Sequence, residues 1–168
     1  MKANIQDIMF PVKEVPARIT SKLPHRDTKD TGYKFIVRED TGDILSCMTD
    51  NYRLINNSTI LEKSDNIISK EGGNLKEVQT FGNGARSIVK YEFDKHKITI
   101  SNGDICTPEI VWSNSYDGTV GLNIIAGAFR LVCTNGLVIG VVAEKYKNKH
   151  IIQNMELKDI DGVIEETI

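Results

Sequence analysis

Residues 75–93 read LKEVQTFGNGARSIVKYEF, and their alternation of apolar and polar positions decides the fold class. In an extended chain Val89, Tyr91 and Phe93 share one face, and the residues between them share the other. Gly82-Asn83-Gly84 separates residues 86–94 from residues 75–81, which have the same two-residue period, and such a turn is a strong hairpin signal. The stretch therefore predicts an antiparallel hairpin in which residues 75–81 pair with residues 86–94.

The segment before this hairpin predicts a second hairpin followed by a helix. Residues 33–38 alternate well enough for a strand, residues 39–43 form a turn, and residues 44–48 supply the returning strand. Asn57 or Ser58 then caps a helix, whose apolar residues recur at near-helical spacing until Gly72-Gly73 ends it. Residues 1–31 hold three of the four prolines and no sustained period, which indicates an extended arm or an irregular lead-in.

The segment after residue 94 predicts further strands and a final helix. Strand character returns at residues 98–101, at residues 105–112 and twice within residues 119–142, and the short connections favour pairing between consecutive strands. Helical spacing at the end of the chain is shown by Leu157, Ile160, Ile164 and Ile168. We expect an α+β fold with a mostly antiparallel sheet, a helix after the first hairpin and a C-terminal helix. The expected parts are an extended N-terminal arm at 1–31, a single α+β domain at 32–150 and an acidic amphipathic helix at 151–168.

The composition indicates a folded cytoplasmic protein. The chain has 168 residues, of which 40% are hydrophobic and 26% charged, enough to bury a core without staples. The three cysteines lack CxxC spacing, so neither a disulfide framework nor a zinc site is indicated, and we expect no cofactor or metal. No signal-peptide core and no apolar run of membrane length occurs.

The charge is distributed unevenly along the chain. The net charge is −2, and residues 151–168 carry one lysine and five acids, a net −4, which leaves +2 for residues 1–150. A mildly basic body with an acidic tail can bind polyanions while the tail competes for the same surface. The simpler alternative is that the tail is a solvated surface helix.

A single arginine, Arg130, lies in a long apolar run that follows the polar segment at residues 114–118. If residues 119–134 formed one uninterrupted strand, Arg130 would lie among apolar residues, and a buried guanidinium needs a carboxylate partner. Asp117 is the nearest acid in sequence, with Glu109 and Glu144 as competitors, so we expect a structural ion pair between Asp117 and Arg130. A break at Gly127 would instead expose Arg130, and a phosphate contact is a further alternative.

Three lysines alternate near the end of the body. In an extended chain Lys145, Lys147 and Lys149 point the same way and Tyr146 points to the other face. Such a row suits a nucleic-acid backbone, although lysines also protect the edges of sheets. Aromatic residues near cations would complete a groove for a single strand. The candidate nucleic-acid-binding residues are Arg86, Lys90, Tyr116, Arg130, Lys145, Tyr146, Lys147 and Lys149.

The sequence carries no recognisable catalytic motif. Neither a GxSxG, HExxH or Walker A pattern nor a dinucleotide fingerprint occurs. Cys133 could act as a nucleophile with a histidine, but a lone cysteine in an apolar run is more often packing. We expect no enzymatic activity. A catalytic reading would have to centre on Asp117, Arg130, Asn135 and His150.

Several blocks in the same order give the chain a family resemblance. They are DTGDILSCMTDNYRLINN at residues 40–57, GARS at 84–87, GD at 103–104 with Pro108, NSYDGT at 114–119, RLVCTN at 130–135 and finally His150. These blocks resemble the phage/plasmid-like proteins of the domain-of-unknown-function 932 family. The resemblance implies a phage, plasmid or prophage context and no settled activity. Members of that family are typically longer, with helical material after the histidine.

These observations lead to two expectations for function. The first is a non-enzymatic phage or plasmid accessory protein that binds nucleic acid, most simply single-stranded DNA in recombination or annealing, and that forms a homo-oligomer. The second is a protein-binding module, a phage inhibitor or assembly factor, that acts on a host or phage protein.

Overall fold

A computed structural model of the chain describes residues 4–19, 29–101, 104–131 and 138–148. Its strands are β1 (Val12–Ile19), β2 (Lys29–Arg38), β3 (Ile44–Thr49), β4 (Asn74–Phe81), β5 (Arg86–Glu92), β6 (Ile98–Ser101), β7 (Asp104–Cys106), β8 (Pro108–Ser115), β9 (Leu122–Leu131) and β10 (Val138–Asn148). Its helices are η1 (Ile5–Ile8), α1 (Asn57–Lys70) and η2 (Asp94–His96). All the strand pairs in these residues are antiparallel. The α+β class is therefore confirmed.

The main sheet has five strands in the order β10-β9-β8-β5-β4. Its hairpin β4–β5 is the one predicted from residues 75–93, with Phe81 opposite Arg86 across the turn. The turn has a positive φ at Gly82, Asn83 and Gly84, which glycine and asparagine tolerate best. Along β5 buried and partly exposed residues alternate, as expected for a strand with only one covered face.

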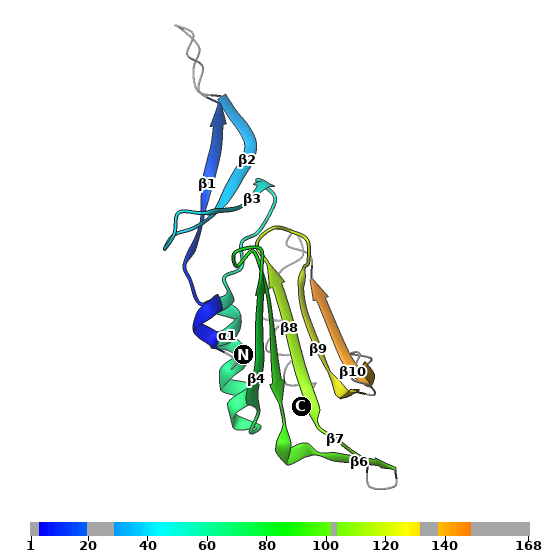
Figure 1. Cartoon of the computed structure of the whole chain (residues 1–168). Coiled ribbons are helices and arrows are strands. Elements are labelled where there is room, and N and C mark those ends of the chain that lie inside the picture. Colours follow the sequence, from blue (N-terminus) through cyan, green and yellow to red (C-terminus); the bar gives the residue numbers. More distant parts are fainter. Residues whose placement is uncertain (1–3, 20–28, 102–103, 132–137, 149–168) are drawn as a thin grey trace, which may run out of the picture.

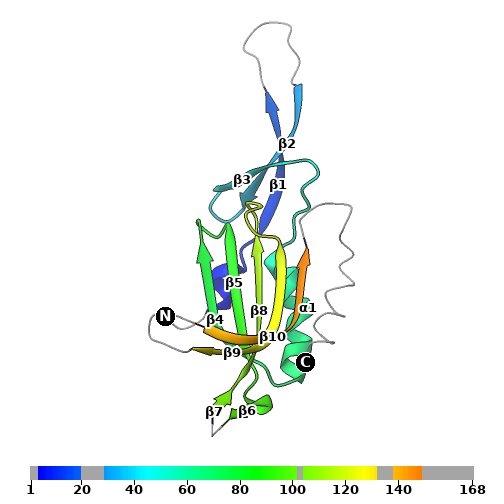
Figure 2. The same cartoon turned by 90° about the vertical axis from the view of Figure 1, so that its right-hand side faces the viewer.

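Helix α1 covers one face of the main sheet, as Figure 2 shows with the sheet in front and the helix behind it. The helix begins at Asn57, as predicted, and buries Ile60, Leu61 and Ile68 in one core cluster with residues of β5, β8 and β9. It ends before Gly73, whose N–H donates to the Ile68 carbonyl at 2.8 Å. A Cβ at this glycine would lie 2.4 Å from Ile68 Cγ2, so the helix can stop here only with a glycine.

The expectation that consecutive strands pair throughout is wrong at residues 98–106. There β6 and β7 form a separate two-stranded sheet, and β5 pairs directly with β8. The Phe93 N–H donates to the Pro108 carbonyl at 3.0 Å and closes the base of the segment that contains β6 and β7. The main sheet continues across this bond through β8, which carries the buried apolar residues Ile110 and Trp112.

The N-terminal segment was also misjudged. Residues 12–19 are extended, as one of the two expectations had it, but they form strand β1, which pairs with β2 in a three-stranded sheet of order β1-β2-β3 that we call the small sheet. The boundary predicted after residue 31 falls inside β2. Prolines hid this strand, because Pro16 disturbs the apolar alternation yet is tolerated on an edge strand. The predicted C-terminal helix at residues 155–168 lies outside the described residues.

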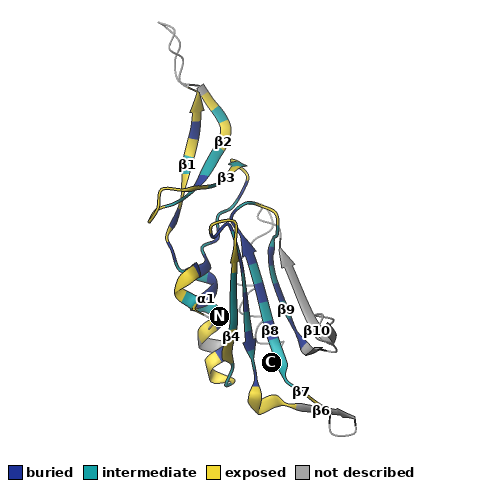
Figure 3. Cartoon of the chain, viewed as in Figure 1, coloured by how far each residue is buried: buried dark blue, intermediate teal, exposed yellow. Residues whose placement is uncertain are grey.

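A second core cluster joins the two sheets. It consists of Phe10, Val12, Ile36, Tyr52 and Tyr116, all less than a tenth exposed, and we call this region the joint. From the joint, β1 and β2 project as a ribbon away from the main sheet (Figure 1). In Figure 3, β1 is yellow over most of its length, whereas β2 is teal and dark blue near the joint and mostly yellow toward the end of the ribbon.

Candidate functional site

The face of the main sheet opposite α1, which we call the open face, holds two of the predicted cations. On β5, Arg86 and Lys90 alternate with Ser87, Val89 and Tyr91, which are buried toward the helix. Arg86 and Lys90 therefore lie on the open face, because alternate residues of a strand share a face.

Strand register extends this face to β10. Lys90 is opposite Val111 of β8, Val111 is opposite Ile125 of β9, and Ile125 is opposite Lys145 of β10. Residues directly opposite each other in paired strands lie on the same face. The position of Lys145 is therefore on the open face, in one row with Lys90.

Lys147 occupies the next row by the same argument, since it is opposite Asn123 of β9. Tyr146 is opposite Ile124, which places its position on the face covered by α1. The side chains of Lys145, Tyr146 and Lys147 and the whole of Lys149 lie outside the described residues. In the strand order β10 is an edge strand, the place where lysines also serve as protection.

Ion pairs offset most of the charge at one end of the open face. Lys90 pairs with Glu77 at 2.7 Å, and Lys76 pairs with Glu92 at 3.2 Å and with Glu109. Hydrogen bonds from Lys90 and Gln79 lower the pKa of Glu77. Burial alone would lower the pKa of Lys76, but its hydrogen bonds to the two glutamates raise it. The opposite charges of these pairs largely offset one another.

The other end of the open face keeps an aromatic and a cation together. The Arg86 guanidinium lies 5.3 Å from the centre of the Phe81 ring, and Phe81 is 42% exposed. The two side chains come from opposite ends of the β4–β5 turn. An exposed ring beside a guanidinium can take a planar ligand by stacking.

Tyr116, predicted to contact nucleic acid, is instead part of the joint. It is 1% exposed, and its hydroxyl accepts a hydrogen bond from the Asn57 N–H at 3.0 Å. Burial raises the pKa of Tyr116 to about 12. Its ring has no free surface on which a base could stack, so the prediction for this residue is wrong.

The predicted ion pair between Asp117 and Arg130 is not brought together. The Asp117 carboxylate accepts hydrogen bonds from the Thr119 N–H at 2.9 Å and from its hydroxyl at 2.5 Å, in the turn before β9. Arg130 lies near the far end of β9, and the eight residue-to-residue steps from Leu122 to Arg130 span about 26 Å of strand. That distance exceeds the combined reach of the two side chains.

The alternative of a break at Gly127 is also wrong for the backbone. β9 runs from Leu122 to Leu131 in one piece, and the register shift of the β9–β10 pair lies between Val142 and Glu144 of β10. Arg130 is opposite Ile139, and the surroundings of its side chain lie outside the described residues.

A buried polar network fills the joint. The Asn57 amide donates to the Ile8 carbonyl at 3.1 Å and to Ser87 Oγ at 3.2 Å, and its oxygen accepts from the Asn114 amide at 2.9 Å. Asn114 also donates to the Ile55 carbonyl at 3.0 Å. Asn57, Ser87 and Asn114 are each 1% exposed. The network ties η1, α1, β5 and β8 together, because each amide bonds to groups from more than one element.

Two tyrosines and a serine continue the network into the small sheet. The Tyr52 hydroxyl donates to the Ser115 carbonyl at 2.9 Å, and the Ser46 hydroxyl donates to the Tyr116 carbonyl at 2.5 Å. The Tyr116 N–H donates to the Ala85 carbonyl at 2.7 Å. Burial raises the pKa of Tyr52 well above its usual value. The hydroxyls therefore stay protonated at neutral pH and serve as hydrogen-bonding groups.

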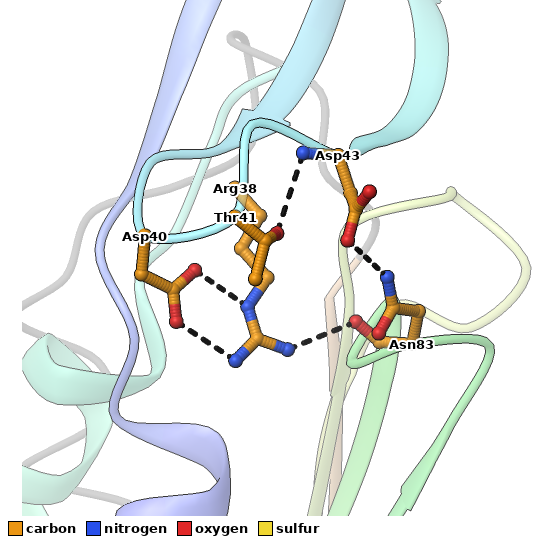
Figure 4. Close-up of polar contacts among 5 residues, drawn as sticks. All are labelled: Arg38, Asp40, Thr41, Asp43 and Asn83. Atoms are coloured by element: carbon orange, nitrogen blue, oxygen red, sulfur yellow. Dashed lines mark hydrogen bonds and ion pairs between the residues drawn. The ribbon is translucent and has the colours of Figure 1, made fainter.

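An ionic clamp lies on the surface of the joint (Figure 4). The Arg38 guanidinium binds both oxygens of Asp40, at 2.7 and 2.9 Å, and donates to the Asn83 carbonyl at 3.2 Å. The Asn83 amide in turn donates to Asp43 at 2.6 Å. The same guanidinium lies 3.8 Å from the centre of the Phe10 ring. The clamp thus connects the turn after β2 to the turn of the β4–β5 hairpin.

Electrostatics keep the clamp ionised at neutral pH. The hydrogen bond between Arg38 and Asp40 raises the pKa of Arg38 and lowers the pKa of Asp40. Hydrogen bonds from Thr41 and Asn83 lower the pKa of Asp43. Groups held in this way are poor proton carriers near pH 7, so the clamp has a structural role.

An open pocket of about 530 Å³ lies beside the joint and is lined by Glu14, Lys34, Tyr52, Arg53 and Leu54. Lys34 pairs with Glu14 at 2.9 Å, and its ammonium group also donates to the Asp50 carbonyl at 3.3 Å. The charged pair inside the pocket is thus already neutralised.

The residues of the catalytic reading are not assembled in the described part of the chain. Asn135, His150, Cys133 and His25 lie outside it, and Asp117 is held by Thr119. His96 is exposed, with Nε2 3.3 Å from the Glu71 carbonyl. Among the described residues no group of three or more His, Cys, Asp or Glu side chains could hold a metal ion.

Sequence reasoning missed the residues that build the joint. Asn57 was considered only as a helix cap and Asn83 only as a residue of the hairpin turn, and neither was linked to Arg38. A signal existed: the blocks at residues 40–57, 84–87 and 114–119, far apart in sequence, contain Tyr52 and Tyr116 of the joint and the network side chains Ser46, Asn57, Ser87 and Asn114. Blocks that keep their order across a family can be separated in sequence because they meet in the fold.

No helix in the described part of the chain is both long and apolar enough to cross a membrane. A search of solved structures finds no match. The family model named "Domain of unknown function (DUF932)" matches residues 44–157, about two-thirds of the chain. The match covers β3 to β10 and hence the whole main sheet and Tyr52 and Tyr116 of the joint, so the protein belongs to the DUF932 family.

Proposed function

We propose that this protein binds single-stranded nucleic acid on the open face of its main sheet. The observation that carries the proposal is the strand register, which gives Lys145 and Lys147 positions on the same uncovered face as Arg86 and Lys90. Cations along an edge can contact phosphates while the centre of the sheet receives bases. The protein would act without enzymatic activity, as an accessory in recombination or annealing of phage or plasmid DNA.

The centre of the open face has suitable chemistry for bases. Val111 and Ile125 are opposite each other by register, Ile88 lies in the next row opposite Ser113, and all three are only partly buried, so they offer an apolar surface. The next row contains Ser113 and Asn123, whose side chains are hydrogen-bonded to each other at 3.2 Å. Base faces can pack on the apolar residues, and base edges can bond to the polar ones.

The two ends of the open face differ in how their charges are paired. At the end with Glu92 and Glu109 the lysines are already paired with carboxylates, whereas Arg86 has no carboxylate partner among the described residues and lies beside Phe81. We therefore expect the strand to lie toward the Arg86 end, across the row that begins with Lys147. Because Glu77 offsets Lys90, the affinity should be modest and should depend on salt.

The test is a titration of a fluorescently labelled 20-nucleotide single strand, followed by anisotropy at 50 and 200 mM salt. The chain should bind in the micromolar range at low salt and lose about tenfold in affinity at high salt. The double variant K145E/K147E should lose at least tenfold, whereas K70E, at an exposed lysine in the last turn of α1, should change affinity less than twofold. Absence of binding at 50 mM salt would rule the proposal out.

A different observation favours a second candidate, a protein-binding module. One face of the small sheet carries Val15, Phe35 and Val37, which are only partly buried and belong to neither core cluster, and beside them Ile44 is 61% exposed. An apolar face of this kind marks contact with a partner protein or a second copy of the chain. If it joins two copies, I44E should convert an oligomer to a monomer in size-exclusion chromatography with light scattering.

A further inference from the structure

We propose that the distal end of the β1–β2 ribbon is a second contact surface for nucleic acid, one that binds the phosphate backbone through Arg18. The distal end comprises residues 17–19 of β1 and 29–33 of β2. This inference rests on the proposed function and deepens it, because it assigns phosphate binding to an element outside the main sheet and outside the residues matched by the family model.

The ribbon is the basic part of an acidic protein. Its 18 strand residues, 12–19 and 29–38, contain five bases and two acids, a net +3, while the whole chain has a net charge of −2. The other 150 residues therefore carry −5. A local positive field on a projecting element attracts a polyanion even when the protein as a whole does not.

Arg18 is the cation that stays available at the distal end. Lys13 pairs with Glu39 at 3.3 Å and Lys34 with Glu14 at 2.9 Å, both nearer the joint. Asp30 is directly opposite Arg18 in the ladder, yet its carboxylate accepts from the Gly32 N–H at 3.2 Å. Arg18 is exposed and makes no ion pair within the described residues. A guanidinium left unpaired beside an acid that bonds elsewhere is free to take a phosphate.

A bulge separates the distal end from the rest of the small sheet. Register shifts between Pro16 and Arg18, so that the segment around Gly32, with φ +69°, forms extra length on β2. The last pair with β3 joins Tyr33 to Thr49. Beyond Tyr33 the ribbon has two strands only, and both Figure 1 and Figure 2 show it pointing away from the main sheet.

The exposed side chains of the distal end have no core to serve. Ile19 is 61% and Tyr33 49% exposed, and a two-stranded ribbon alone is only marginally stable in water. A ribbon of this width fits the major groove of a duplex, and an exposed tyrosine can stack on an unpaired base. The shared chemistry is the phosphate backbone, so single-stranded and duplex nucleic acid are separate arms of the test.

The experiment titrates the full chain with two labelled probes, a 20-nucleotide single strand and a 20-base-pair duplex, at several salt concentrations. R18E should weaken binding of at least one probe about tenfold, and R18A should lower the salt slope of log K by about 0.7 for a single strand or 0.9 for a duplex, the loss of one phosphate contact. Y33A should weaken only the single strand. K70E is the matched charge reversal and should have less than a twofold effect.

The outcomes separate this inference from the function on which it rests. If the unaltered chain binds and K145E/K147E loses affinity while R18E keeps it for both probes, the ribbon is not a contact surface and the open face is. If R18E alone loses affinity, the ribbon is the main site and the open-face proposal fails. If the unaltered chain binds neither probe, both proposals fall. Circular dichroism of R18E should match the unaltered chain, since Arg18 is exposed.

Discussion

Replacing Asn57 by alanine should destabilise the protein strongly, although the side chain touches no proposed ligand. Its amide group makes three hydrogen bonds in the joint, to the Ile8 carbonyl, to Ser87 and with the Asn114 amide. The bond from the Asn57 backbone N–H to Tyr116 is unaffected by the change. The variant therefore removes side-chain bonds only.

The structure sets the size of the effect. Three hydrogen bonds at a net value of about 1 kcal/mol each give a loss of about 3 kcal/mol. The partners left behind are buried, since Ile8 is fully buried and Asn114 is 1% exposed, and unsatisfied buried groups add to the loss. At about 2 kcal/mol per M of urea, a loss of about 3 kcal/mol moves the unfolding midpoint by about 1.5 M.

The assay is urea unfolding followed by the emission of Trp112, the only tryptophan, which is 1% exposed. N56A is the matched control. Asn56 is the preceding residue, and its side-chain oxygen has no hydrogen-bond partner in the described residues, so its loss should move the midpoint by no more than about 0.3 M. A shift in N57A as small as that in N56A would refute the argument that this network holds the joint.

Two further predictions concern the same region. G84A should lower the free energy of unfolding by about 1–3 kcal/mol in thermal unfolding, because Gly84 has φ +93° and a Cβ there would lie 2.4 Å from Phe10 Cζ. G42A should lower it by about 1 kcal/mol, because Gly42 has φ +77° but nothing lies within 4 Å of its Cβ position. Equal losses in the two variants would contradict the contact with Phe10. Acid should weaken the clamp. Arg38 depresses the folded pKa of Asp40 below its ordinary 3.8, so the contribution of the Asp40 carboxylate to the stability of the fold is present above pH 4 and is lost as the pH falls through the folded pKa. D40N should lack this step in a stability titration from pH 5 to pH 2, and an unchanged titration would argue against the clamp.

Local patterns predicted most elements but not how they assemble. The hairpin around Gly82-Asn83-Gly84 and the helix from Asn57 were predicted because turn chemistry and periodicity act over a few residues. The separate β6–β7 sheet was missed because strand periodicity does not say which strand is the neighbour. Strand β1 was missed because Pro16 and the small sheet's partly exposed face weaken the alternation.

The predictions for the candidate site succeeded or failed for the same reason: local patterns were reliable, and long-range neighbours were not. Lys90 was placed on the face opposite Val89 and Tyr91 from the period of a single strand, and the structure agrees. Asp117 and Arg130 were paired from closeness in sequence, yet a strand of this length carries its two ends far apart. Tyr116 looked like a stacking platform, but its ring is enclosed in the joint.

By itself, the amino-acid sequence determined the α+β class, the central hairpin, the helix and the family, since each of these depends on residues close in the chain or on an ordered set of motifs. Only the tertiary structure decided that those motifs meet in one buried network, that Lys145 and Lys147 belong by register to the face of Arg86, and that Arg18 stands on a projecting ribbon. The physical reason is that burial, pairing and charge neutralisation depend on which distant segments become neighbours, and a one-dimensional pattern holds no record of that choice.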